Sequence, residues 1–535
     1  MSVTDSVTIA AELAAAAEGH VQRLVEQRAA SRISEQDPTL WGPAAEAEAA
    51  IRLGWTKLHA TSRDLIGDVA TLRSELAGEG IERVVLAGMG GSSLAPEVIS
   101  RTEGVPLTIL DTTDPGQVAD ALAGDLNRTV LVVSSKSGTT VETDSQRRIF
   151  AQAFAEQNPG VDPGRRMIVV TDPGSPLAEL ADKEGYRRLF LADPNVGGRY
   201  SALSAFGLVP AGLAGADIAR LLDQAAVIRE KLAADDPQNP AIRLAAALAA
   251  AHDNGAEKLV IADHDSGIPG LGDWIEQLIA ESTGKDRTGV LPVIVESVDA
   301  PGFADAGADA TTVAIGEPVD GAAVSVRLQL GEQFLFWEYV TALLGSLLSI
   351  NPFDQPDVEA AKKAARGLLD SPGAEQPEPA LTAGAVQVFP GPGVSAGGDL
   401  TETIRKFAEQ IPEGGYLAVQ AYLNREDDAS ASLLRTELAK RTGRQVTFGW
   451  GPRFLHSTGQ YHKGGHPNGA FLQITGDSPD DLEVPGRPYT LGELQLAQAL
   501  GDGQVLSDLQ RPVLRLHLAD RAAGLADVVR AIQGL

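Results

Sequence analysis

Three short apolar runs, each ending in a turn of small polar residues, most strongly constrain how this chain can fold. They are Val84–Ala87, Val130–Val133 and Met167–Val170. Each run is hydrophobic without alternation, which is typical of strands buried on both faces of a parallel sheet covered by helices. Ligands of such sheets bind at the carboxyl ends of the strands. The sequence therefore predicts an α/β fold whose functional residues follow these strands.

The same pattern continues further along the chain. We expect strands at 258–262 and 290–295, helical segments over 217–253 and a long apolar helix over 332–350, with later strands near 416–421, 445–449, 470–474 and 513–518. The Ala-rich residues 4–33 favour helix. The Pro-rich residues 371–385 predict a linker. The chain is long enough for about three or four folding units.

The charge balance excludes several classes of partner. The 535 residues include 44 basic and 72 acidic ones, for a net charge of −28, and no cysteine. Nucleic acids and anionic membranes both need clustered Lys and Arg, so we expect neither. Disulfides, thiolate nucleophiles and Cys-zinc sites are excluded. The start carries no signal-peptide pattern, and Glu338 interrupts the longest apolar stretch, so we expect a cytoplasmic protein.

A glycine-rich loop follows the first strand. Its residues are Gly88-Met89-Gly90-Gly91-Ser92-Ser93. Glycines at this place allow backbone N–H groups to approach an anion at a helix N-terminus. On this segment alone two alternatives stay open. One is a nicotinamide site, since Asp111 lies about twenty residues further on, and the other is a turn without a ligand.

A second loop follows the next buried strand and favours a phosphate ester. Ser135-Lys136-Ser137-Gly138-Thr139-Thr140 offers hydroxyls and one ammonium group within six residues. Hydroxyl and backbone N–H donors suit a terminal phosphate, with Lys136 as a point charge. A dinucleotide site has no need of such a loop. The alternative is a solvent-exposed Ser/Thr turn without a ligand, but two such loops at neighbouring strand ends favour a binding site.

These residues resemble the sugar isomerase domain of the phosphoglucose isomerase family. The resemblance covers residues 85–370 and rests on four stretches, namely 88–92, Ser135–Thr143, Asn195–Ser204 and Asn351–Lys362. It implies two doubly wound sugar isomerase (SIS) domains at 61–215 and 216–370. An N-terminal helical segment, 1–60, would precede them and a C-terminal α/β unit, 371–535, would follow.

The resemblance also implies an activity and a binding site. The activity is the interconversion of glucose 6-phosphate and fructose 6-phosphate, without cofactor or metal. The phosphate would be held by Gly91, Ser92, Ser135, Lys136, Ser137 and Thr140. A small sugar phosphate is then the expected partner, and the family's usual homodimer is possible.

This interconversion moves a proton between C2 and C1 of the sugar, which needs a base to carry the proton and a cation to stabilise the enediolate. Arg199 follows two glycines, and a guanidinium stabilises a developing oxyanion without losing its proton. By resemblance it stabilises the enediolate. Glu281 lies at the end of an apolar-periodic helix, where partial burial would favour a general base. We prefer it to Glu317, which stands in a poor version of the segment that supplies the base in longer family members.

Ring opening needs an acid and a second proton carrier. Carry-over from the family makes Lys362 the acid, with Gln355 hydrogen-bonding substrate and Lys363 solvated on another helix face. The family's histidine should lie between base and lysine, but none occurs between 281 and 362. The matching stretch comes late, at Phe454–Gln460, so we expect His456 to act, with His264 as second choice. This order resembles the isomerase half of transaldolase–isomerase fusions, although no transaldolase-length region is present.

Some alternatives stay open on the sequence alone. His456, His462 and His466 could hold a metal, but their spacing is loose and no carboxylate lies among them, so we expect none. Whether His456 acts within its own chain or across a dimer is not fixed. A sugar-phosphate sensor that lost its chemistry, or an isomerase of another hexose 6-phosphate, is the alternative function.

Overall fold

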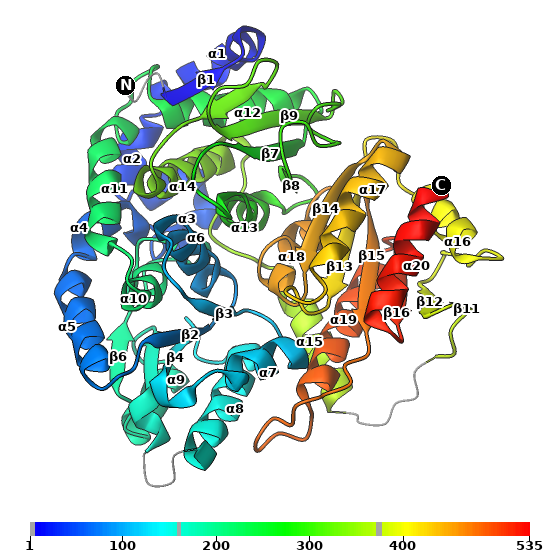
Figure 1. The fold of residues 1–535 in the computed structure, drawn as a ribbon. Helices are drawn as coiled ribbons and strands as arrows, with labels where there is room; N and C mark the ends of the chain where they lie inside the picture. The colour runs from blue at the N-terminus through cyan, green and yellow to red at the C-terminus, as the bar shows by residue number, and fades with distance from the viewer. Residues whose placement is uncertain (1–5, 158–161, 371–376) are drawn as a thin grey trace.

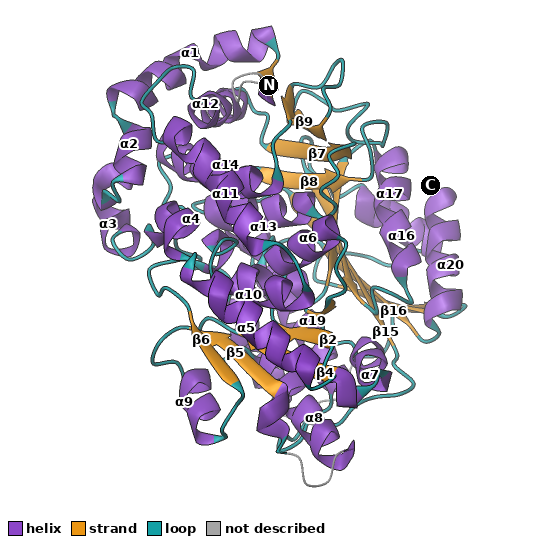
Figure 2. Cartoon of the chain, turned by 60° about the vertical axis from the view of Figure 1, so that its left-hand side comes forward, coloured by secondary structure: helices purple, strands orange, loops and turns teal. Residues whose placement is uncertain are grey.

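The chain folds around three mainly parallel sheets. The computed structural model describes residues 6–157, 162–370 and 377–535 (Figure 1). Helices pack around all three sheets (Figure 2), and this confirms the predicted α/β fold class. Within the described ranges, no helix combines the length and the apolar character that a membrane span requires.

The first sheet has the order β3-β2-β4-β5-β6, and all its strands are parallel. Its strands are β2 (Arg83–Ala87), β3 (Thr108–Leu110), β4 (Thr129–Ser134), β5 (Met167–Thr171) and β6 (Arg188–Leu191). The three predicted runs form β2, β4 and β5. The chain runs from β2 to β3 on one side and then back past β2 to β4. The carboxyl ends of β2 and β4 therefore flank the point where connections diverge, the usual ligand position in such sheets.

The second sheet has the order β1-β10-β9-β7-β8. Its strands are β1 (Val7–Ile9), β7 (Lys258–His264), β8 (Leu291–Val295), β9 (Ala310–Gly316) and β10 (Val324–Val326). The predicted strands at 258–262 and 290–295 are present as β7 and β8. The expectation of helix throughout 4–33 is wrong at β1, which pairs antiparallel with β10. Two of its three residues are β-branched and apolar, and Val7 is buried against the sheet, which favours a strand.

The third sheet has the order β11-β12-β16-β15-β13-β14. Its strands are β11 (Leu381–Ala383), β12 (Val386–Pro390), β13 (Tyr416–Tyr422), β14 (Gln445–Trp450), β15 (Gly469–Gly476) and β16 (Val513–Leu518). The four strands expected in this region form its parallel part. Residues 371–376 of the predicted linker lie outside the described residues. The rest of the linker prediction is wrong at β11, which forms a hairpin with β12 around Gly384, whose φ is +60°.

The helices cover the sheets and fill the space between them. In the N-terminal half they are α1 (Ala11–Glu26), α2 (Ala29–Ser34), α3 (Pro43–Ala49), α4 (Leu58–Thr61), α5 (Asp64–Gly78), α6 (Leu94–Glu103), α7 (Pro115–Ala123), α8 (Val141–Gln157), α9 (Pro176–Lys183), α10 (Ala205–Ala214), α11 (Ile218–Leu232) and α12 (Pro240–Asp253). The rest are α13 (Leu271–Thr283), α14 (Leu330–Leu347), α15 (Glu359–Leu369), α16 (Leu400–Ala408), α17 (Leu433–Thr442), α18 (Gly459–Gly464), α19 (Leu491–Asp508) and α20 (Arg521–Gln533). The long apolar helix predicted at 332–350 is α14, and every one of its residues is buried.

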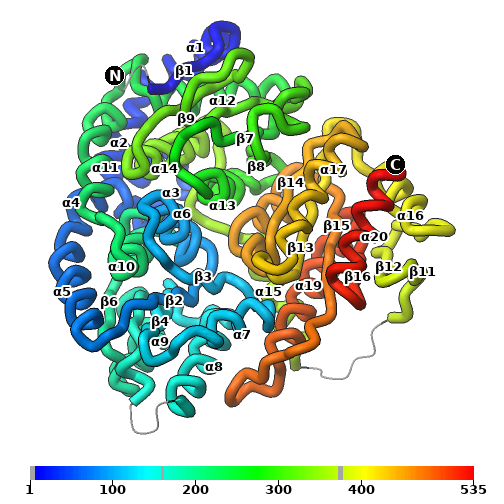
Figure 3. Tube along the Cα trace, viewed as in Figure 1, coloured from blue at the N-terminus to red at the C-terminus, as the bar shows by residue number. Residues whose placement is uncertain are grey.

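The C-terminal part packs against both other sheets (Figure 3). Tyr416 and Phe471 of the third sheet share a hydrophobic cluster with Leu291 and Val293 of β8. Leu491 at the start of α19 belongs to a second cluster, which includes side chains of β2 and β4. The residues after 377 are therefore held against both earlier sheets. The exact domain boundaries stay a prediction.

Candidate active site

One cavity of about 630 Å³ lies where these parts of the chain meet. We call it the first cavity. It is lined by every site residue predicted from the sequence: Gly91, Ser92, Ser135, Lys136, Ser137, Thr140, Arg199, Glu281, Gln355, Lys362 and His456. They come from segments up to 365 positions apart, counted from Gly91 to His456. His456 reaches the cavity from the same chain as all the others.

The glycine loop allows three backbone segments to touch. After β2 the chain makes a short 3₁₀ turn, η4 (Gly90–Ser92). A Cβ atom on Gly91 would lie 2.0 Å from the carbonyl oxygen of Gly198, just before Arg199. A Cβ on Gly90, whose φ is +54°, would lie 2.8 Å from the carbonyl oxygen of His456. Glycine is therefore required here for close approach, as well as for backbone conformation.

The second loop presents hydroxyls at the start of a helix. Ser135 Oγ and Thr140 Oγ1 are 2.9 Å apart, and α8 begins at the next residue, Val141. The unpaired N–H groups of a helix's first turn attract anions. The ammonium of Lys136 differs from the expected free point charge, because it pairs with Asp172 at the end of β5. Burial raises the pKa of Asp172, and the Lys136 charge opposes that rise.

Arg199 is buried, and each of its three guanidinium nitrogens donates a hydrogen bond. Nε donates to Ser282 Oγ at 2.8 Å, Nη1 donates to Gln355 Oε1 at 2.9 Å, and Nη2 donates to the carbonyls of Pro352 and Asp354, both at 2.8 Å. Nη1 also lies 3.4 Å from Glu281 Oε1. The guanidinium therefore fixes Gln355 and places its charge beside the carboxylate of Glu281.

Glu281 projects from the last turn of α13. One turn earlier, Gln277 donates to Glu281 Oε2 at 3.2 Å and to the carbonyl oxygen of His456 at 2.7 Å. This buried amide, which the sequence did not single out, ties the carboxylate to the histidine segment. Glu317, the alternative base, does not line the first cavity and instead pairs with Arg327 at the surface.

His456 is oriented by a buried carboxylate. Its Nε2 lies 2.9 Å from Glu142 Oε1, which also accepts a 2.8 Å hydrogen bond from Gln498. Burial opposes the charge on Glu142, but His456 and its hydrogen bond hold the pKa of this carboxyl below its usual range. Glu142 belongs to the stretch that carries the family resemblance, yet its role depends on a partner 314 positions away.

The loop with Gln355 is braced by a second cation. Lys285 donates to the carboxylate of Asp354 at 2.7 Å and to the carbonyl of Asn351. Burial, and the nearby charge of Arg199, lower the pKa of Lys285 to about 8. On the helix that follows, Lys362 pairs with Glu359 at 2.8 Å and lines the first cavity, whereas Lys363 is exposed, as expected from its position.

The remaining histidines have other partners. His462 is buried beside the rings of Tyr416 and Phe471, and His466 pairs with Glu257. His264 does not line the first cavity. Among the residues that the structure describes, no group of three or more His, Asp and Glu side chains is arranged to hold a metal.

A buried ion cluster lies beside the histidine segment. Arg453, in the short turn η9 (Arg453–His456), pairs with Glu97 of α6, with Asp111 after β3 at 2.6 Å and with Asp273 of α13 at 3.6 Å. Burial opposes the charge on Arg453, but these carboxylates raise its pKa. The cluster attaches the segment that carries His456 to elements of the first two sheets.

The lining of the cavity therefore combines two sets of chemical groups. Hydroxyls and helix N–H groups at the carboxyl ends of β2 and β4 suit a phosphate ester. A carboxylate, a guanidinium, an imidazole and an ammonium line the same cavity, which suits proton transfer on a carbonyl compound.

The chain is similar in sequence to known sugar-phosphate isomerases. The family model described as phosphoglucose isomerase matches residues 4–311. A probable glucose-6-phosphate isomerase of Natronomonas pharaonis is 32% identical over 358 residues, which cover 56% of this chain and 81% of that protein. The glucose-6-phosphate isomerase of Clostridium novyi is 30% identical over 367 residues, covering 55% and 81%.

Solved structures show a related fold. The crystal structure of a glucose-6-phosphate isomerase from Chlamydia trachomatis matches with a TM-score of 0.52 and 19% identity, over 67% of this chain and 85% of that one. A hypothetical protein of Thermus thermophilus matches with a TM-score of 0.57 and 24% identity, over 68% and 99%. The family model ends at residue 311, before Lys362 and His456.

The close approach of Gly91 to Gly198 gives a first prediction. We expect Gly91→Ala to lower the free energy of unfolding by about 1–3 kcal/mol, because the new methyl group overlaps a backbone oxygen. It should also weaken binding of inorganic phosphate, measured by calorimetry. Gly67→Ala on the exposed side of α5 is the matched control, since a Cβ there meets nothing within 4 Å. Equal thermal stability of both variants would contradict the prediction.

The buried pair of Glu142 and His456 predicts a pH-dependent stability. A carboxyl with a lowered folded pKa stabilises the fold above its unfolded value, near 4.5, and this contribution is lost as the pH falls through the folded pKa. We expect Glu142→Gln to destabilise the protein by about 1.5–3 kcal/mol at pH 7. The difference in melting temperature from the unsubstituted protein should shrink as the pH is lowered below 4.5. A difference that stays constant down to pH 3 would show that the charge of Glu142 is not responsible.

Proposed function

The chain belongs to the phosphoglucose isomerase family, and we propose that it interconverts glucose 6-phosphate and fructose 6-phosphate through an enediolate, a reaction of glycolysis and gluconeogenesis. The observation that carries the proposal is the first cavity. A phosphate-type loop, a carboxylate, a guanidinium, an imidazole and an ammonium line it together within one chain.

The phosphate anchors the substrate at the ends of β2 and β4. We assign it to Gly91 and Ser92 on one side and to the hydroxyls of Ser135, Ser137 and Thr140 on the other. Lys136, shared with Asp172, adds its charge at the edge of this group. Binding energy from the non-reacting phosphate then orients C1 and C2 for the chemical steps.

Ring opening falls to His456 and Lys362. Glu142 occupies Nε2 of His456, so Nδ1 is the ring nitrogen left for the substrate. As the C1–O5 bond breaks, Lys362, as the acid, gives a proton to the ring oxygen, and Nδ1 of the imidazole accepts the proton of the anomeric hydroxyl. Gln355, held by Arg199, hydrogen-bonds the substrate's hydroxyls.

Glu281 then carries the proton between C2 and C1. Its carboxylate is only partly exposed and is held on one side by Gln277. Arg199 lies beside it, and its fixed positive charge stabilises the enediolate oxygen as the C–H bond breaks. Each step uses side chains of this chain, so the proposed mechanism needs no metal or organic cofactor.

We propose that a single subunit forms a complete site. Because His456 reaches the first cavity in its own chain, one subunit supplies the whole set of proposed catalytic groups. A homodimer would then add stability rather than a missing residue.

Phosphorylated hexoses are charged and do not cross membranes unaided, so we place the reaction in the cytoplasm.

The assignment of Glu281 predicts a large and specific loss of turnover. In buffer containing EDTA, the unsubstituted enzyme should exchange the C2 hydrogen of glucose 6-phosphate with solvent deuterium. Glu281→Gln should lower kcat by about 10²–10⁴-fold, the usual contribution of a general base, with substrate binding retained. Glu317→Gln, a glutamate outside the cavity, is the matched control. Full activity of Glu281→Gln refutes the assignment, and binding without exchange in the unsubstituted protein indicates a sensor.

The ion cluster makes Arg453 a positioning residue for His456. We expect Arg453→Met to reduce kcat by at least tenfold with little change in KM, because the phosphate contacts lie elsewhere. Arg453→Lys should restore part of kcat. The matched control is Arg435→Met, because Arg435 is also buried and joins the C-terminal part to Glu296, away from the first cavity. This control should lose stability but keep kcat; equal kcat losses in both variants would point to a purely structural effect.

A further inference from the structure

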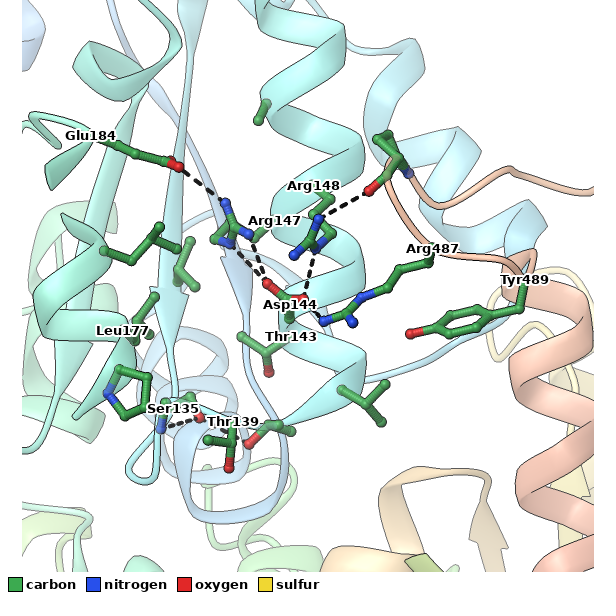
Figure 4. A pocket seen from close by; sticks show the side chains of 18 of the residues that line it. Ser135, Thr139, Thr143, Asp144, Arg147, Arg148, Leu177, Glu184, Arg487 and Tyr489 are labelled. Carbon is green, nitrogen blue, oxygen red and sulfur yellow. Dashed lines mark hydrogen bonds and ion pairs between the residues drawn. The ribbon is translucent and has the colours of Figure 1, made fainter. Parts of the chain in front are cut away.

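A second and larger cavity lies against the same loop as the first. Its volume is about 1090 Å³, and its walls come from α8, from α9, from the end of α15 and from residues 485–489. Figure 4 shows most of the side chains that line it. None of the proposed catalytic residues lines this second cavity, which shares only Ser135 and Thr140 with the first cavity.

An arginine cluster dominates one wall. Arg147, Arg148 and Arg487 all point toward the carboxylate of Asp144, which accepts hydrogen bonds of 2.7, 2.7 and 2.8 Å from them (Figure 4). Burial opposes the charge on Asp144, but these hydrogen bonds lower its pKa to about 2. One carboxylate is thus shared among three guanidinium groups. A fourth arginine, Arg366 of α15, also lines the cavity.

The balance of charge in the cavity is positive, in contrast with the rest of the chain. Four arginines line it against three carboxylates, those of Asp144, Glu184 and Asp370. Glu184 lies on the far side of Arg147, at 3.8 Å. The net charge of the whole chain is −28. A positive patch in such an acidic protein favours anions over cations.

Several donors in the cavity are still available. Arg148 uses Nε and Nη1, and Arg487 uses Nη2, so other N–H groups of both guanidinium groups have no partner among the residues described. Arg366 makes no side-chain hydrogen bond or ion pair with any described residue. The buried hydroxyl of Thr143 is likewise without a partner in the described part of the chain. Guanidinium groups bind phosphate oxygens in pairs, with two parallel N–H donors.

The two cavities are separated by one loop. Ser135 and Thr140 line both of them, and their hydroxyls are hydrogen-bonded to each other at 2.9 Å. A ligand that moves either hydroxyl in the second cavity therefore alters the loop that we assign to the sugar phosphate. This gives a direct route from one cavity to the other.

We propose that the second cavity binds a small anion with two or more phosphate groups, held by Arg148, Arg366 and Arg487. All three arginines line this cavity, and its volume of about 1090 Å³ is ample for such an anion. The bound anion changes the affinity of the first cavity for its substrate through Ser135 and Thr140. This second part rests on the proposed isomerase function, whereas the binding itself does not.

Titration calorimetry with inorganic pyrophosphate tests the binding. We expect a dissociation constant at least tenfold lower for pyrophosphate than for inorganic phosphate, and weaker binding at higher ionic strength. The double variant Arg148→Ala/Arg487→Ala should weaken pyrophosphate binding at least tenfold. The double variant Arg63→Ala/Arg220→Ala removes two exposed, ion-paired arginines from the surface and should bind as before.

A second set of variants separates the two cavities. Ser92→Ala and Ser137→Ala change residues that line only the first cavity, and pyrophosphate binding should persist in both. The proposal is overturned if these variants lose pyrophosphate binding. It is also overturned if the unsubstituted protein does not bind pyrophosphate. If the double arginine variant fails to fold, Arg366→Ala tests the site instead, because Arg366 is exposed and its loss should leave the fold intact. Unchanged binding in that variant then counts against the site.

Steady-state kinetics test the coupling. Pyrophosphate should change KM for fructose 6-phosphate at least twofold in the unsubstituted enzyme and not in the double arginine variant. An unchanged KM, in an enzyme that binds pyrophosphate through these arginines, overturns the coupling but leaves the site. If the protein proves not to be an isomerase, the calorimetric result still decides whether the second cavity binds polyphosphate.

Discussion

The contact between the segment that carries His456 and the first two sheets is the constraint on which the site depends. Arg453 anchors this segment among the carboxylates of Glu97, Asp111 and Asp273, and the backbone of His456 touches Gly90. Burying an ion cluster costs desolvation energy, so it contributes less to stability than to a defined arrangement. The arrangement brings the imidazole of His456, in the turn that follows β14, to a cavity lined by residues that follow β2 and β4.

Much of the fold could be predicted because buried parallel strands leave a strong signal. The runs at 84–87, 130–133 and 167–170 are continuous and apolar, and each became a strand of the first sheet. Two of the missed strands, β3 and β10, have only three residues each and look like loops in isolation. Longer ones were missed as well: β9 has seven residues, but Thr311 and Thr312 interrupt its apolar run, and β12 contains Gln387 and Pro390. Their strand character depends on neighbours in the sheet, which local sequence does not encode.

Some residues of the candidate site could likewise be predicted from local sequence, and others could not. The motifs after β2 and β4, and around Arg199 and Glu281, could be found because each carries its chemistry within a few residues. Gln277, Glu142 and Arg453 act through partners more than a hundred positions away, so their roles needed coordinates. The pairing of Lys136 with Asp172 has the same origin, because two neighbouring strand ends meet only in the folded sheet.

Helix α8 connects these separate parts. Its start closes the phosphate-type loop, Glu142 on its first turn holds His456, and Asp144 gathers the arginines of the second cavity. Residues two apart on a helix point to different faces, so one turn serves both cavities at once. Gln498 and Arg487, both from the C-terminal part, bind these two carboxylates. A shift of the C-terminal part would therefore act on the histidine and on the arginine cluster through the same helical turn.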